Sequence, residues 1–169
     1  MEREAEKVAA YHEAGHMVTA WELGLDVQGA TIIPNPETGR AGGVVIPFDE
    51  RLRYADWVDE REYLYAHLVA WCAGAEAGDM YLGAPMPDVD LGLVISTPDS
   101  DLERMAHFVI ELGGPDESSQ VEVGDDAVRH ARNLLAARWE EVSEIAGVLM
   151  ERGTLDADEC REQLEGARG

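Results

Sequence analysis

The chain has 169 residues, of which 46% are hydrophobic and 28% charged, and this composition is typical of one globular domain rather than a disordered chain. It carries 35 acidic and 13 basic residues, which gives a formal net charge of −22. Because such a surface repels phosphate backbones and anionic lipid, the charge excludes direct nucleic-acid binding. No apolar run approaches the length of a bilayer span, so we expect no membrane insertion by this chain.

The two cysteines, Cys72 and Cys160, lie far apart and form no CxxC motif, which excludes both a disulfide framework and a zinc knuckle. The N-terminal segment MEREAEK is charged and has no apolar core of the kind that a secretion signal needs. We therefore expect reduced thiols and a cytoplasmic location.

The first predicted element is a helix from Glu2 to about Leu23, which is rich in Ala and Glu, contains no proline and stops at Gly24. Two short β-branched runs follow within residues 29–47, separated by a turn of Asn, Pro and Gly. They predict a small hairpin or a pair of edge strands.

Helical periodicity returns at residues 56–81. The stretch 82–96 is rich in Gly and Pro and is predicted to be a loop. Thr97–Pro98 then suits the start of a third helix, because threonine caps helices and proline is favoured at the first helical position. That helix is expected to end near the Gly-Gly-Pro sequence at 113–115.

Asp125–Asp126 are expected to cap a long helix that runs to about Glu151. A break at 153–154 and a short final helix to about Glu165 complete the chain. The elements together predict a mainly α domain with one small β element, in the α+β class.

The most informative motif is HEAGH at residues 12–16. Residues four apart lie on one face of a helix, so His12 and His16 can bind one zinc ion at about 2.0–2.1 Å each. Glu13 lies roughly 60° around the helix from His16. It can therefore act as general base toward a zinc-bound water, whose pKa the metal lowers to about 7, without being a ligand.

Two simpler explanations of the motif are a chance match and a pair of surface histidines. Chance produces this pattern in fewer than about 1% of chains of this length. A surface helix is disfavoured because the neighbours of the histidines, Tyr11, Ala14, Gly15 and Met17, are small or apolar. This neighbourhood indicates a helix buried against another.

A tetrahedral catalytic zinc ion needs a third protein ligand. The extended signature HExxHxxGxxH is absent, because Thr19 and Glu22 occupy the positions of its Gly and final His. His67, His107 and His130 are isolated and are interpreted as core or surface residues. A carboxylate remains, and the candidates are Asp79, Asp88, Asp90, Asp99, Asp101 and Glu103.

Residues 10–16, AYHEAGH, resemble the zinc-binding segment of the FtsH-type ATP-dependent zinc proteases. The resemblance extends over about residues 5–165. Its further parts are two short strands at 31–34 and 41–47, a second helix at 73–83, the SDLE segment at 100–103 and LMERGTL at 149–155.

This resemblance implies that His12, His16 and Asp101 are the zinc ligands, that Glu13 is the general base, and that each chain holds one zinc ion. It also implies that residues 1–169 form a single FtsH-like zinc peptidase domain of the helical zincin type, with HExxH on its first helix. The expected activity is zinc-dependent endopeptidase cleavage of unfolded or flexible polypeptide substrates.

The chain departs from the family pattern in three respects. Gly78 and Asp79 stand where the family typically has a pair of Glu residues, and the sequence contains neither a GxxxxGK[ST] phosphate-binding loop nor a membrane span. The ATP-driven unfolding of the family is therefore not transferred to this chain. A homo-oligomer and a separate ATPase partner are both left open, as is the choice between an excised domain and a free-standing relative.

Two other functions remain as alternatives. One is a catalytically silent zinc-binding interaction module or adaptor, against which the intact Glu13 counts. The other is a zinc hydrolase that acts on a non-peptide amide. For the endopeptidase, the run at 43–47 suits pairing with an extended substrate. The sequence alone identifies no group that stabilises the oxyanion.

Overall fold

The computed structural model describes residues 2–40, 42–48, 60–83 and 100–168. The predicted mainly α fold with a small β element is confirmed. Within the described residues no helix is long and apolar enough to cross a membrane. The elements are α1 (Glu2–Glu22), β1 (Gly29–Thr31), β2 (Gly43–Val45), α2 (Glu60–Tyr81), α3 (Asp101–Gly113), α4 (Glu117–Ala137), α5 (Trp139–Arg152), β3 (Thr154–Asp156) and α6 (Ala157–Arg168).

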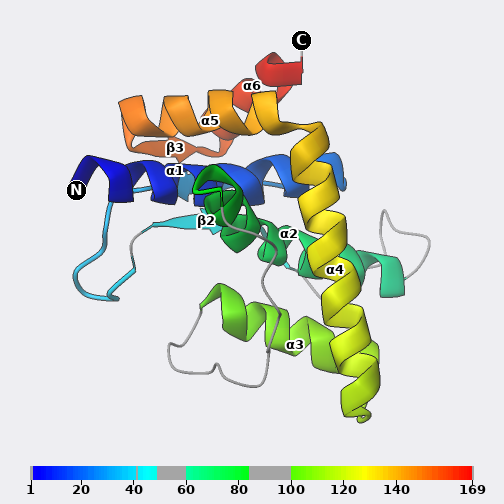
Figure 1. The fold of residues 1–169 in the computed structure, drawn as a ribbon. Coiled ribbons are helices and arrows are strands. Elements are labelled where there is room, and N and C mark those ends of the chain that lie inside the picture. The colour runs from blue at the N-terminus through cyan, green and yellow to red at the C-terminus, as the bar shows by residue number, and fades with distance from the viewer. Residues whose placement is uncertain (1, 41, 49–59, 84–99, 169) are drawn as a thin grey trace.

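Helix α1 lies at the centre of the packing. It contacts α2 on one side and α5 on another, while α2 also packs against α3 and α4 (Figure 1). Helices α1 and α2 approach closely because small residues meet between them: a Cβ built on Gly15 would lie 2.5 Å from the Cβ of Ala77. The core that results is continuous from α1 to the sheet and to the C-terminal helices.

The three strands form one antiparallel sheet in the order β2-β1-β3. Ala30 of β1 is in register with Val44 of β2 and with Leu155 of β3, and all three side chains are buried. The predicted hairpin at 29–47 is confirmed. The third strand was not predicted, because three residues are too few to show a period-2 pattern.

The third helix begins later than the sequence indicated. Ser100 is its N-cap, since its side chain accepts a hydrogen bond from the backbone N–H of Glu103, and helix α3 starts at Asp101. The expected cap at Thr97–Pro98 and most of the expected loop at 82–96 lie outside the described residues.

The expected cap at Asp125–Asp126 is wrong, because both residues lie inside α4. The actual N-cap is Asp116, which accepts a hydrogen bond from the backbone N–H of Ser119 at 3.0 Å. The expected single helix to Glu151 is also divided. Arg138, with φ −117° and ψ 21°, leaves the helical conformation between α4 and α5.

Candidate metal centre

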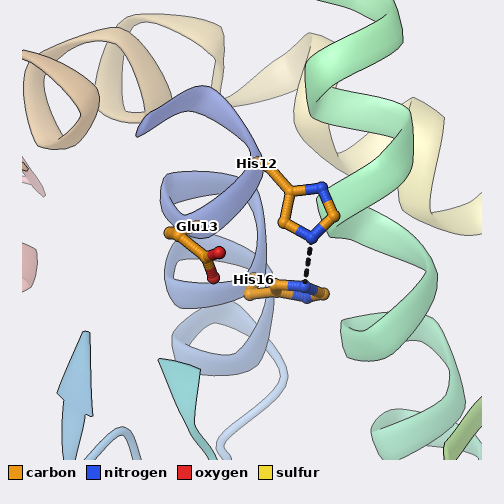
Figure 2. Close-up of side chains that lie close together, drawn as sticks. All are labelled: His12, Glu13 and His16. Carbon is orange, nitrogen blue, oxygen red and sulfur yellow. Dashed lines mark hydrogen bonds between the residues drawn. The ribbon is translucent and has the colours of Figure 1, made fainter. Parts of the chain in front are cut away.

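Helix α1 places His12, Glu13 and His16 in one cluster (Figure 2). The two imidazoles lie one above the other, one helical turn apart, and their Nε2 atoms are 3.1 Å apart. Glu13 projects from the same helix on the side of the strands, as Figure 2 shows. The nearest ligand atoms of the three side chains all lie within 4.8 Å of one another.

Asp101 joins this cluster from the first residue of α3. Its Oδ2 atom lies 2.8 Å from His12 Nε2 and 2.9 Å from His16 Nε2. The three atoms therefore form a nearly equilateral triangle with sides of 2.8, 2.9 and 3.1 Å. At zinc–nitrogen distances of about 2.0–2.1 Å, tetrahedral geometry places two ligand atoms about 3.3 Å apart, so the triangle is close to the size that zinc requires.

The hydrogen bonding of His16 indicates that the triangle is suited to a cation. His16 is fully buried, and its Nδ1 lies 2.8 Å from the carbonyl oxygen of Ala70. Nδ1 must donate there, so in the neutral ring Nε2 carries a lone pair, and this lone pair faces the carboxylate of Asp101. A proton can bridge only two of the three atoms in the triangle, whereas a metal ion contacts all three.

Two glycines leave the space that the cluster occupies. A Cβ built on Gly74 of α2 would lie 2.2 Å from His16 Nε2 and 2.7 Å from His12 Nε2. A Cβ built on Gly42 would lie 2.8 Å from Glu13 Oε1. The backbone of α2 thus lies directly behind the imidazoles, and the chain just before β2 lies directly against the carboxylate.

The two carboxyl groups of the cluster differ in their proton affinity. Burial raises the pKa of Glu13 to about 7, an effect that the nearby His12 and Arg104 partly oppose. Burial also tends to raise the pKa of Asp101, but the adjacent imidazoles of His12 and His16 outweigh it and hold that pKa well below its usual range. Asp101 is therefore a carboxylate at neutral pH, as a metal ligand must be.

The cluster opens onto a cleft of about 390 Å³, here called the metal-site cleft, which lies between α1, residues 40 and 42–44, and the start of α3. A groove of about 340 Å³ continues from it along β2, and a pocket of about 310 Å³ around Phe48 and Phe108 adjoins that groove. Arg104 lines all three spaces. An extended chain can therefore run from the cluster along β2.

The structure brings together the four residues that the sequence singled out: His12, Glu13, His16 and Asp101. Among the other carboxylates, Glu103 donates its backbone N–H to the N-cap Ser100, and Asp79 is a half-buried residue near the end of α2. Asp88, Asp90 and Asp99 lie outside the described residues.

The three isolated histidines are core or surface residues, as predicted. His67 is fully buried and packs against the rings of Tyr63 and Phe108. His107 and His130 are exposed.

The sequence analysis missed the residues that surround the cluster. Gly74 belongs to a run of small residues in α2, which is a readable signal of close helix packing. Arg104 lies three residues after Asp101 and so shares its helix face. Nothing in the sequence pattern indicated that Trp71 contacts the cluster. Its ring contacts His16 edge-to-face at a centroid distance of 5.1 Å, and the Arg104 guanidinium lies 4.4 Å from its centroid.

The buried acidic residue of α2 is Glu76. It does not stand at positions 78 and 79, where the family pattern has a pair of Glu residues. Glu76 lies 3.0 Å from Arg132 of α4, and its side chain is 5% exposed. Burial raises its pKa, and Arg132 opposes this effect. Because this ion pair joins α2 to α4, we interpret it as a structural link rather than part of the cluster.

Comparison with known proteins gives one informative similarity. No protein-family model matches the chain. The chain is 27% identical, over 199 aligned residues, to the ATP-dependent zinc metalloprotease FtsH of Neorickettsia risticii (strain Illinois). The alignment covers 97% of this chain but 29% of that protein, so the chain spans less than a third of its relative's length. The similarity is weak, but it extends over nearly all of the residues that build the fold and the cluster.

Proposed function

We propose that the chain is a single zinc peptidase domain that hydrolyses peptide bonds in unfolded or flexible chains. The observation that supports this most directly is the meeting of three possible ligand atoms, from His12, His16 and Asp101, beside the buried carboxylate of Glu13. The weak similarity to a zinc metalloprotease points to the same chemistry.

His12, His16 and Asp101 would hold one zinc ion per chain. When bound, the ion supplies a Lewis acid that polarises the scissile carbonyl and lowers the pKa of water. Glu13 would accept a proton from the attacking water and later deliver it to the leaving nitrogen. Gly42 leaves the space that the Glu13 carboxylate occupies, because a Cβ at position 42 would lie 2.8 Å from Glu13 Oε1.

Strand β2 is the element that would align the substrate. In the described part of the chain it is an edge strand, and its residues line both the metal-site cleft and the adjoining groove. An extended peptide that pairs with Gly43–Val45 would bring a carbonyl group past Glu13. A folded domain offers no such segment without local unfolding, so flexible chains are the expected substrates.

The cellular setting follows from less direct observations. Cys72 and Cys160 are free and buried, as thiols of cytoplasmic proteins commonly are, so we propose a cytoplasmic location. The relative is named as ATP-dependent, whereas these 169 residues contain no phosphate-binding loop. We propose that the domain works as a homo-oligomer or together with an ATPase, whether in the same chain or as a separate partner.

The test is zinc analysis followed by cleavage of a fluorogenic peptide and of casein. We expect one zinc per chain and cleavage by the wild-type protein. Glu13→Gln should keep the zinc and lose about 10²–10⁴-fold in rate, the usual size of a general-base contribution. Glu6→Gln, which removes a charge from an exposed position of the same helix, is the matched control and should keep full activity. A zinc-loaded wild-type protein that cleaves neither substrate would contradict the proposal.

A further inference from the structure

Peptide hydrolysis needs a group that stabilises negative charge on the substrate carbonyl oxygen. As the water oxygen bonds to the carbonyl carbon, one water proton passes to Glu13 and the electron pair of the C=O double bond moves onto the oxygen. When the C–N bond breaks, that pair re-forms the carbonyl and the nitrogen takes the proton from Glu13, leaving a carboxylic acid and an amine. Between these two events the oxygen is an anion.

We propose that Arg104 is the catalytic residue that faces this anion. This inference rests on the proposed peptidase function. Arg104 lines the metal-site cleft together with His12, Glu13 and Asp101. Its Nη1 atom lies 3.5 Å from Asp101 Oδ1, while the other oxygen of the same carboxylate belongs to the ligand triangle. The cation therefore lies beside the position where the reacting carbonyl must approach.

The guanidinium is held in place by stacking rather than by a close ion pair. It lies 4.4 Å from the centroid of the Trp71 ring, which is itself buried. The same ring packs edge-to-face on His16, so one indole sets the positions of both a ligand and the cation. Stacking covers one face of the guanidinium and leaves its in-plane N–H donors free to bond an oxygen.

A purely structural role for Arg104, as a support for Asp101, is less well matched by the geometry. The contact of 3.5 Å is at the outer limit of a hydrogen bond and involves one of five N–H donors. The side chain is 32% exposed and borders all three spaces along the expected substrate path. A group whose only task is to orient Asp101 would not need to face the cleft.

The metal-site cleft is also a place where a cation has a large effect. The chain has an excess of 22 negative charges, so the electrostatic field of the protein disfavours an anion that forms in the cleft. Two arginines, Arg40 and Arg104, line the cleft beside the buried Glu13. Arg104 is the one next to the ligand triangle, because it is one helical turn from Asp101.

The experiment compares Arg104→Met, Arg104→Ala and Arg104→Lys with the wild-type protein. We expect kcat for Arg104→Met to fall about 10²–10³-fold, the usual cost of removing an oxyanion donor, with KM changed less than about threefold. Zinc stoichiometry and zinc affinity should stay at the wild-type level. Added guanidinium at millimolar concentration should restore part of the activity of Arg104→Ala. The kcat of Arg104→Lys should lie between those of the wild type and Arg104→Met.

Two inhibitors distinguish an effect of Arg104 on transition-state binding from an effect on ground-state binding. A peptide phosphinate, which mimics the tetrahedral anion, should bind Arg104→Met more weakly in proportion to the loss of kcat/KM, whereas the corresponding hydroxamate should be little affected. Arg161→Met removes the same charge from an exposed site on α6 and is the matched control.

Three results would overturn the assignment, and they are distinguishable. An inactive wild-type protein would contradict the proposed function and this inference together. An active wild type with an unchanged Arg104→Met variant would contradict this inference alone. A variant whose activity is restored by excess zinc, but not by guanidinium, would show that Arg104 orients Asp101 instead.

Discussion

Gly74 of α2 lies directly behind the ring of His16, so that a Cβ at position 74 would be 2.2 Å from His16 Nε2. Real atoms do not approach so closely, so the His16 ring would have to move. The His16 ring cannot easily move away from Gly74, because its Nδ1 donates a hydrogen bond to the carbonyl oxygen of Ala70. The absence of a side chain at Gly74 is therefore a condition for the ligand triangle.

Gly74→Ala is expected to weaken zinc binding by at least about tenfold, since displaced support of a ligand already costs 10–100-fold in metal affinity. Zinc affinity is measured by competition with a chromogenic chelator, and folding by far-UV circular dichroism. Gly78→Ala is the control in the same helix, because its new Cβ would meet Val8 at an ordinary 3.6 Å. Equal zinc affinity in the two variants would contradict the prediction.

Asp101→Ala is expected to lower zinc affinity by more than about 10²-fold, because it removes the proposed third ligand and not only the support of a ligand. The measurement is the same chelator competition. Asp79→Ala, which changes another acid that the sequence left as a candidate, should bind zinc like the wild type. If Asp101→Ala kept full zinc affinity while Asp79→Ala lost it, the third ligand would have to be reassigned.

His67 is expected to make the protein less stable in mild acid. Burial lowers the pKa of His67 to about 4, and its ring nitrogens have no hydrogen-bond partner among the described residues. Between pH 6.5 and about 4 the unfolded chain binds a proton that the folded chain does not, so stability falls as pH falls through this window. The full effect is on the order of 3 kcal/mol.

His67→Phe should remove this part of the pH dependence, whatever its effect on stability at pH 8. The free energy of unfolding is measured in urea between pH 4 and 8. His107→Ala, at an exposed histidine, should keep the wild-type slope. Parallel curves for all three proteins would rule out a contribution from His67.

Salt is expected to stabilise the fold. The 22 excess negative charges repel one another, and raising KCl shortens the screening length from about 10 Å at 0.1 M to about 3 Å at 1 M. The Tm should therefore rise with KCl, and NaCl should act equally because screening does not depend on the identity of the cation. A flat curve would mean that the repulsion is already relieved in the folded state.

The domain alone is expected to cleave disordered chains and to spare compact ones. A stable domain with a disordered basic tail is the test substrate, because local unfolding of the domain can cost up to its global stability of about 5–15 kcal/mol. Only the tail should be lost, the rate should not depend on ATP, and the preference for a basic tail should weaken as salt rises. Rapid digestion of the folded part would contradict this.

The first half of the site could be predicted from sequence because it is local. His12, Glu13 and His16 belong to one helix, and helical spacing alone places two of them on one face. The hairpin at 29–47 is local in the same sense. Asp101 is different: several carboxylates were equivalent on the residues alone, and the resemblance to a family singled it out. Its contact with both histidines depends on how α3 packs against α2.

The missed features are those that depend on three-dimensional neighbours. Asp125–Asp126 has the composition of a helix cap, but Asp116 caps α4 instead, and Asp126 forms an ion pair with Arg129 on the helix surface. Strand β3 exists because β1 has a free edge to pair with, which three residues of sequence do not reveal. Trp71 and Arg104 meet across two helices, so no spacing in the sequence connects them.

The position of β3 has a consequence for the order of assembly during synthesis. Strand β1 is paired on one side by its sequence neighbour β2 and on the other by Thr154–Asp156, and Ile32 also donates a hydrogen bond to Gly153. The sheet that borders the metal-site cleft is thus complete only after residue 156 has left the ribosome. Contacts between such distant segments form slowly. A newly made chain therefore completes this sheet late, after nearly all of the residues that build the fold have been synthesised.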